Sequence, residues 1–299
     1  MRILSLTVVL LAATAMLATA QLSVEVVTEQ DQFLRDEPLP IKVRITNRSG
    51  QTLQFGKDNN WLSFMIESQD GAVVSKLMDV PVIGEFTLES AQMATRQVDL
   101  MPCFDLSKPG RYKVSATVKV KEWNDEVGSK PKPIEVTRGT KIWEQTFGVP
   151  TSSGAPDARK YVLQQAHYQK QLKLYLRLTD INDNKVFRVF PIGQLVSFSQ
   201  PEAQLDGSSN LHVLFQTGAR SFLFSVINPD GELVIQQTYD YTATRPVLRA
   251  NEEGRIFVAG GLRRLIKRDV PSSLPGKEEA SSNLPVEPGS NNDGTVPKK

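Results

Sequence analysis

The chain has 299 residues, which is enough for about two domains. Its single cysteine, Cys103, excludes an internal disulfide, so apolar cores have to supply the stability. The 35 Lys and Arg residues nearly balance the 33 Asp and Glu residues, and this balance argues against a dedicated nucleic-acid binder, which gains affinity by neutralising phosphates.

Residues 1–20 have the pattern of a secretory signal peptide. A short positive start is followed by an apolar run over residues 3–17 and by the small-x-small sequence Ala18-Thr19-Ala20. Cleavage after Ala20 would leave Gln21 first. The alternative is an uncleaved membrane anchor, for which the run is short, and no later segment is apolar enough to cross a bilayer. We therefore expect a secreted or periplasmic protein without a transmembrane segment after signal cleavage.

The strand that begins at Tyr112 organises the first half of the chain. Over residues 112–120, apolar and polar side chains alternate, so one set faces a core and the other faces water. The turn Pro109-Gly110 comes directly before this strand. A Tyr in this place can bond its hydroxyl back to the preceding backbone, as in the tyrosine corner of sandwich domains, or can simply be buried at the start of a surface strand. Both interpretations require a second sheet that covers the apolar face.

Residues 21–149 predict an antiparallel sandwich of short strands with turn residues between them. The further strand patterns lie at residues 22–27, 41–45, 62–67, 86–88 and 98–100, and Trp143, Phe147 and Val149 end the unit. Cys103 stands between Met101 and Phe104, which predicts that its thiol is buried. No helix-period segment of useful length occurs in this half.

This order of strands resembles bacterial Ig-like sandwich domains, and most of all the proteinase-inhibitor-type sandwich group. The residues that carry the resemblance are 37–43 leading to 45–47, and Asp105-Leu106-Ser107 with Pro109-Gly110-Arg111-Tyr112. The resemblance covers about half of the mature chain. It implies a fold and brings no catalytic residues with it.

A long, charged and Pro-rich segment over residues 122–141 departs from a compact sandwich of this kind. It contains Trp123. A Trp on a long loop can serve as a binding anchor, or it can fold back on its own domain.

Residues 150–159 have the composition of a linker, and strand patterns resume over residues 160–268. Within this second unit, residues 201–215 resemble residues 246–260, an offset of 45, and residues 172–197 look like a shorter copy. The repeat resembles the blade units of secreted propeller proteins, including a strand, the turn Asn228-Pro229-Asp230-Gly231 and a second strand.

The second unit holds only two to three such copies, whereas closed propellers need at least about four blades. The resemblance therefore implies that the sheets stack without closing, that the open side packs on the first domain, or that chains associate. Three similar hairpins in an ordinary meander are the alternative.

The end of the chain changes in character. Arg263, Arg264, Lys267 and Arg268 form a basic cluster that could touch anionic polymers or lipid surfaces, or could simply blunt an exposed strand edge. Residues 269–299 are rich in Pro, Ser, Gly and Asn and cannot form a core, so we expect a disordered tail.

Few residues suggest chemistry. Asp180-Ile181-Asn182-Asp183-Asn184 resembles the calcium-binding linker of cadherin repeats, although Asp and Asn are also the usual residues of a turn between strands. His167 and His212 lie far apart without a zinc-binding spacing, and His212 alternates with apolar residues as a structural residue does. We find no nucleophile elbow, no S-x-x-K pair and no P-loop, and Cys103 has no base near it in sequence.

We therefore predict an all-β protein: an Ig-like antiparallel sandwich, two to three blade-like β-meander units and a disordered C-terminal tail. We expect an exported, non-catalytic binding or scaffold protein without catalytic, cofactor-binding or metal-binding residues. Its partner would be a protein or a cell-envelope polymer and no nucleic acid, and self-association into a homo-oligomer is left open. The candidate binding contacts are Trp123, Arg263, Arg264, Lys267 and Arg268.

Two other functions remain open. The first is a proteinase inhibitor that inserts an extended loop, residues 122–138, into a protease cleft. The second is a hydrolase whose site is assembled from scattered residues, for which an Asp183→Ala variant is a test.

Overall fold

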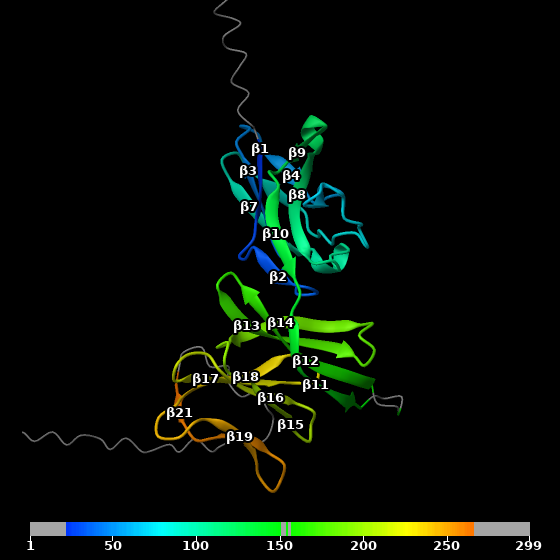
Figure 1. The fold of residues 1–299 in the computed structure, drawn as a ribbon. Coiled ribbons are helices and arrows are strands. Elements are labelled where there is room, and N and C mark those ends of the chain that lie inside the picture. Colours follow the sequence, from blue (N-terminus) through cyan, green and yellow to red (C-terminus); the bar gives the residue numbers. More distant parts are fainter. Residues whose placement is uncertain (1–21, 151–153, 155–156, 266–299) are drawn as a thin grey trace, which may run out of the picture.

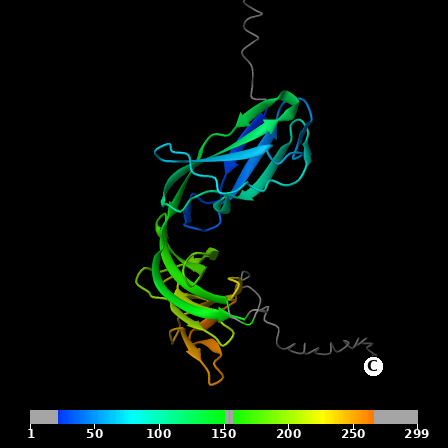
Figure 2. The ribbon, with the colours of Figure 1, turned by 90° about the vertical axis from the view of Figure 1, so that its right-hand side faces the viewer.

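The computed structural model describes residues 22–150, 154 and 157–265, and these residues form several sheets, nearly all of them antiparallel. The prediction of an all-β protein is therefore confirmed. The expected signal peptide and the expected disordered tail lie outside the described residues. Figures 1 and 2 show two lobes arranged end to end, one over residues 22–137 and the other over residues 140–265. The part of the chain that the structure describes contains no helix of the length and apolarity that a membrane span requires.

Two sheets face each other in the first lobe and share one core (Figure 1). The first sheet contains β1 (Leu22–Val27), β3 (Pro40–Asn47) and β7 (Met93–Asp99). The second contains β2 (Gln32–Leu34), β10 (Lys132–Thr137), β8 (Gly110–Val120) and β5 (Leu62–Ser68), and β9 (Asp125–Gly128) pairs with β8. A small pair of strands, β4 (Leu53–Phe55) and β6 (Phe86–Leu88), lies beside them. Alternate residues of β3 and β8 are buried, as the period of two predicts.

Tyr112 and Cys103 lie in the first lobe as the sequence predicts. The Tyr112 hydroxyl donates a hydrogen bond to the Lys108 carbonyl across the turn before β8, which confirms the tyrosine-corner interpretation. Cys103 is fully buried at the end of a short 3-10 helix, η2 (Met101–Cys103). Burial, together with the nearby Asp99 carboxylate, raises the pKa of this thiol.

The segment over residues 122–138 is not an open loop. After η3 (Lys121–Trp123), the chain forms β9 and then β10, both paired with β8. Trp123 is half-buried and packs against the core of its own lobe. Most of this segment is therefore hydrogen-bonded strand.

The second lobe contains two up-and-down meanders. The first runs β11 (Thr140–Val149), β12 (Asp157–Tyr168), β13 (Gln171–Asp180) and β14 (Val186–Gln194). The second runs β15 (Glu202–Leu205), β16 (Leu211–Gln216), β17 (Ser221–Ile227) and β18 (Leu233–Asp240), with β21 (Leu262–Arg264) at its edge. A hairpin of β19 (Val247–Ala250) and β20 (Ile256–Ala259) follows the second meander. The inner faces of the two meanders pack together through residues such as Tyr161, Leu176 and Phe215.

The expectation that Trp143, Phe147 and Val149 end the first unit is wrong. Strand β11 pairs along its length with β12, and Phe147 lies in the core of the second lobe, stacked on Tyr161 at 4.3 Å between ring centroids. Residues 150–156 therefore connect two neighbouring strands of one sheet, and residues 157–159 belong to β12. The lobes are joined instead at Arg138 and Gly139, between β10 and β11.

The 45-residue repeat corresponds to a repeated hairpin. In the β15–β16 hairpin, Leu205 pairs with Leu211, and in the β19–β20 hairpin, Ala250 pairs with Ile256. Both members of the second pair lie 45 residues after those of the first, so the two hairpins share one register. The described residues thus contain repeated β-hairpins in open meanders.

Candidate functional site

The first lobe rests on the outer face of the first meander of the second lobe. Leu34, at the end of β2, packs against Ala166, Tyr175 and Val189. The turn after β2 places Asp36 in the left-handed region, with φ 64°, and its carboxylate lies 2.5 Å from Nη1 of Arg177 on β13. Asp is one of the few residues other than glycine that adopts this conformation readily. The turn therefore carries both an apolar and an ionic contact between the lobes.

Glu37 stabilises this turn from within. Its carboxylate accepts hydrogen bonds from the Leu34 backbone N–H at 2.7 Å and from the Gln30 amide at 3.2 Å. The side chain is buried, and burial raises the pKa of the carboxyl although both hydrogen bonds and Lys173 act in the opposite direction. Glu37 thus stabilises the conformation of the turn and is shielded from solvent.

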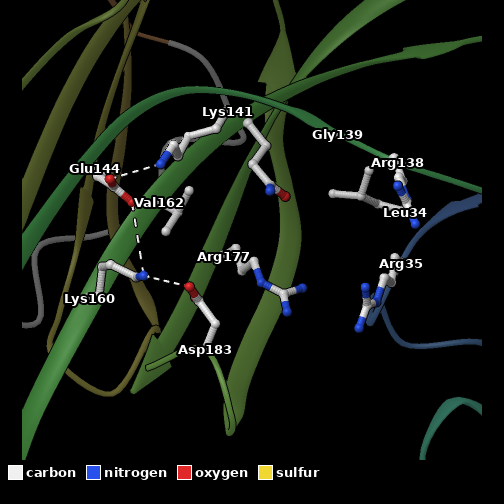
Figure 3. A pocket seen from close by; sticks show the side chains of 11 residues that line it. Leu34, Arg35, Arg138, Gly139, Lys141, Glu144, Lys160, Val162, Arg177 and Asp183 are labelled. Carbon is white, nitrogen blue, oxygen red and sulfur yellow. Dashed lines mark hydrogen bonds and ion pairs between the residues drawn. The ribbon is translucent and has the colours of Figure 1, made fainter. Parts of the chain in front are cut away.

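Beside this contact lies a polar pocket of about 410 Å³ that both lobes build (Figure 3). The size is typical of a small-ligand site. The lining residues come from the end of β2 and the turn after it, from the connection between the lobes and from strands β11, β12 and β13, with Asp183 from the turn after β13. They are Leu34, Arg35, Arg138, Gly139, Lys141, Glu144, Lys160, Val162, Gln164, Arg177 and Asp183.

Strand register explains how the floor of the pocket is assembled. On β12, Tyr161 and Leu163 point into the core of the lobe, so Lys160, Val162 and Gln164 lie on the opposite face. Val162 is paired with Glu144 of β11 on one side and with Arg177 of β13 on the other. Charged side chains therefore stand in a row across three rigid strands, and an apolar residue lies between them.

The acidic groups of the pocket are held by lysine. Nζ of Lys160 lies 2.7 Å from a carboxylate oxygen of Asp183 and 4.0 Å from one of Glu144, and Lys141 approaches Glu144 at 2.8 Å (Figure 3). The hydrogen bond from Lys160 lowers the pKa of Asp183, and a further hydrogen bond from the Thr179 hydroxyl at 3.0 Å acts in the same direction. Asp183 is therefore an anion at neutral pH.

The arginines leave the pocket with an excess of positive charge. Arg177 is largely buried and is neutralised by Asp36, whereas Arg35 reaches the same carboxylate only at 3.5 Å. Arg138 is exposed and has no ion-pair partner among the described residues. In Figure 3, Arg35 and Arg138 lie on one side of the pocket and the Lys160, Glu144 and Asp183 network lies on the other. The arrangement attracts anions and offers planar guanidinium groups to a carboxylate or similar group.

The structure does not bring the sequence-predicted binding contacts to this pocket. Arg263 and Arg264 lie on β21, at the edge of the second meander, where Arg264 forms an ion pair with Asp240. Trp123 lies in the first lobe, packed on its core. Lys267 and Arg268 are outside the described residues. None of these side chains is among those that line the pocket, and each stays a prediction as a binding contact.

The other sequence candidates have structural roles. In the turn over residues 180–184, Asp180 accepts a hydrogen bond from the Lys185 backbone N–H at 3.1 Å, and Asp183 is bound by Lys160. His212 is buried, with Nε2 3.0 Å from a carboxylate oxygen of Asp206. No group of three or more His, Cys, Asp or Glu side chains suited to a metal ion occurs among the described residues.

Sequence reasoning missed the pocket because its residues come from separate segments. One signal was present: Arg177 interrupts the apolar run from Leu174 to Leu178. A charged residue on the non-core face of such a strand needs either solvent or a second layer. Whether solvent or a second layer covers this residue depends on the position of the first lobe, and packing sets that position.

Comparisons with known proteins give little guidance. Neither a protein-family model nor a curated protein matches the chain. Among solved structures, the sporulation control protein Spo0M from Bacillus subtilis matches with a TM-score of 0.31 and 9% identity, over 58% of this chain and 90% of that chain. A likeness at this level carries no argument about fold or function.

Proposed function

We propose that this protein is an exported, non-catalytic binding or scaffold protein that holds an anionic ligand in the pocket between its lobes. The observation that carries the proposal is the pocket itself, in which Arg35 and Arg138 from the side of the first lobe face Lys160 and Arg177 of the second. Export rests on the signal-peptide pattern of residues 1–20. An anionic polymer of the cell envelope or an acidic partner protein fits this location and this charge.

The groups in the pocket are suited to binding rather than to proton transfer. Arginine keeps its charge at any physiological pH, and Asp183 is kept ionised by Lys160. A carboxylate with a lowered pKa is a poor general acid, whereas glycoside-cleaving and similar enzymes use a carboxyl whose pKa is raised. This reasoning favours the binding protein over the hydrolase.

We also propose an Ig-like class for the first lobe and a blade-like class for the meanders of the second. Two facing sheets and the Tyr112 hydrogen bond support the first assignment. Open four-stranded meanders and the repeated hairpin register support the second.

The test uses the mature chain, residues 21–299, on surfaces coated with carboxymethyl dextran or with neutral dextran. We expect binding to the charged surface alone, and we expect it to weaken as salt is added because exposed charges are screened. An Arg35→Gln/Arg138→Gln variant should bind at least about tenfold more weakly, since each arginine offers charge-assisted hydrogen bonds.

The matched control is an Arg249→Gln/Lys170→Gln variant, which removes the same charge from exposed positions away from the pocket. It should bind as the wild type does. Equal weakening in both double variants would show that net charge alone governs binding, and the proposal would then be wrong.

A further inference from the structure

The pocket between the lobes holds two kinds of recognition group side by side. Arg35, Arg138 and Arg177 present guanidinium donors, and Glu144 and Asp183 present carboxylate acceptors within the same cavity of about 410 Å³. Leu34 and Val162 also line the cavity (Figure 3), but both are almost fully buried. A ligand that satisfies the exposed groups has to carry anionic groups and hydrogen-bond donors over a short length.

Building on the proposed function, we infer that the ligand is a short segment of an acidic polysaccharide whose carboxylates alternate with hydroxyl-bearing sugar atoms. A uronate carboxylate fits the fork of Arg35 or Arg138 in bidentate fashion. Sugar hydroxyls donate to the carboxylates of Glu144 and Asp183. The chemistry of the two sides of the pocket is thus matched by one repeating unit.

Densely charged polymers fit less well. Closely spaced phosphates would lie against the anionic Glu144 and Asp183, where like charges repel. The described residues that line the pocket also include no aromatic side chain on which a base could stack. Polyphosphate and nucleic acid are therefore disfavoured although the pocket is cationic.

An acidic peptide fits less well for a different reason. Extended peptides usually gain affinity by adding a strand to an open sheet edge. The pocket floor is instead the face of a sheet: Val162 and Arg177 lie on β12 and β13, whose backbones are already paired on both sides. The floor therefore offers side chains rather than an open strand edge, and a saccharide needs no strand pairing.

The experiment titrates the mature chain with four probes and measures the heat of binding by calorimetry. The probes are tetragalacturonate, tetraglutamate, linear tetraphosphate and a four-nucleotide oligothymidylate. We expect tetragalacturonate to bind most tightly. Arg138→Gln should weaken its binding about tenfold, and the surface control Arg249→Gln should leave it unchanged. Arg138 is exposed, so its replacement should leave the fold intact, which circular dichroism will verify.

A second variant tests the role of the carboxylates. Glu144→Gln/Asp183→Asn keeps the shape of the pocket and removes its negative charge, so polyphosphate should gain affinity and the preference for galacturonate should shrink at least several-fold. If polyphosphate or glutamate is preferred by the wild type in an Arg138-dependent way, the saccharide inference is overturned and the proposed anion-binding function stands. If no probe depends on Arg138, both are overturned.

Discussion

Tyr112 fixes the start of β8 through one hydrogen bond across the preceding turn. Its ring is buried, and its hydroxyl donates to the Lys108 carbonyl. In a Tyr112→Phe variant the ring still fills its site, but the carbonyl loses its partner. We expect the free energy of unfolding to fall by about 1 kcal/mol in chemical denaturation. Tyr241→Phe, at an exposed position, is the control and should have no effect; a loss of equal size there would contradict the interpretation.

The buried carboxyl of Glu37 makes stability depend on pH. Because burial raises its pKa in the folded protein, the folded state binds the proton more tightly than the unfolded chain does. The stabilisation from the protonated form is complete below the unfolded pKa, about 4.3, and is lost as pH rises through the higher folded value. Over this interval the wild type should therefore lose stability as pH increases.

Glu37→Gln removes the titration while keeping an amide oxygen that accepts from the Leu34 N–H. Denaturation curves between about pH 4 and pH 7 should show the free energy of unfolding of the wild type falling relative to that of the variant as pH rises. A difference that stays constant, or that grows with pH, would mean that the hydrogen bonds to the carboxylate outweigh burial.

The sequence indicates the role of Tyr112 more clearly than that of Glu37. Tyr112 follows a Pro-Gly turn at the head of a clear alternating strand, so its role was predictable, as was the burial of Cys103 among apolar neighbours. Glu37 looks like a solvent-exposed charge in sequence. Its burial results from the tight turn and from the second lobe behind it, which local patterns do not encode.

Three hairpins of the second lobe share one loop design. In the loops 206–210, 228–232 and 251–255, an Asp or Asn side chain accepts backbone N–H groups, and the fourth residue has positive φ. That fourth residue is Gly231 or Gly254 in two of the loops and Ser209, with φ 62°, in the third. Glycine adopts this conformation without strain, whereas a residue with a Cβ is disfavoured.

Opposite substitutions at equivalent positions should therefore have opposite effects. Ser209→Gly should raise the free energy of unfolding by up to about 1 kcal/mol, and Gly254→Ala, where a Cβ meets no neighbour, should lower it by about 1 kcal/mol. Thermal and chemical denaturation will measure both. Gly207→Ala, at ordinary φ and in open space, should have little effect. Changes of the same sign at 209 and 254 would show that the loops are not equivalent.

The hairpins were visible in the sequence because turn chemistry and strand alternation are local. The position of β11 was not. Its apolar residues alternate in a way that suits either lobe, and the Ser, Gly and Pro residues after Val149 look the same in a hairpin connection as in a linker between domains. Pairing with β12 decides the matter, and pairing depends on residues far along the chain.

The pocket depends on how the lobes meet, and Gly139 lies at that point. A Cβ at residue 139 would lie 2.9 Å from Cβ of Gln164 and 3.2 Å from a methyl carbon of Leu34. The first distance is too short for a carbon contact, and Cβ of Gln164 is fixed to the backbone of β12. Gly139→Ala should therefore push the connection away from the outer face of the sheet.

Such a shift moves Arg35 and Arg138 relative to Lys160 and Arg177, so the variant should lose anion binding while each lobe stays folded. We expect carboxymethyl-dextran binding to fall several-fold and the radius of gyration in small-angle scattering to increase, with an unchanged circular dichroism spectrum. The overpacking should also lower the free energy of unfolding by about 1–3 kcal/mol. Gly128→Ala, whose Cβ would make only a 4.0 Å contact, is the control. Gly139→Ala could instead bind and scatter as the wild type does. In that case the close contact of Gly139 with β12 does not determine the geometry of the pocket, and its two sides do not act as one site.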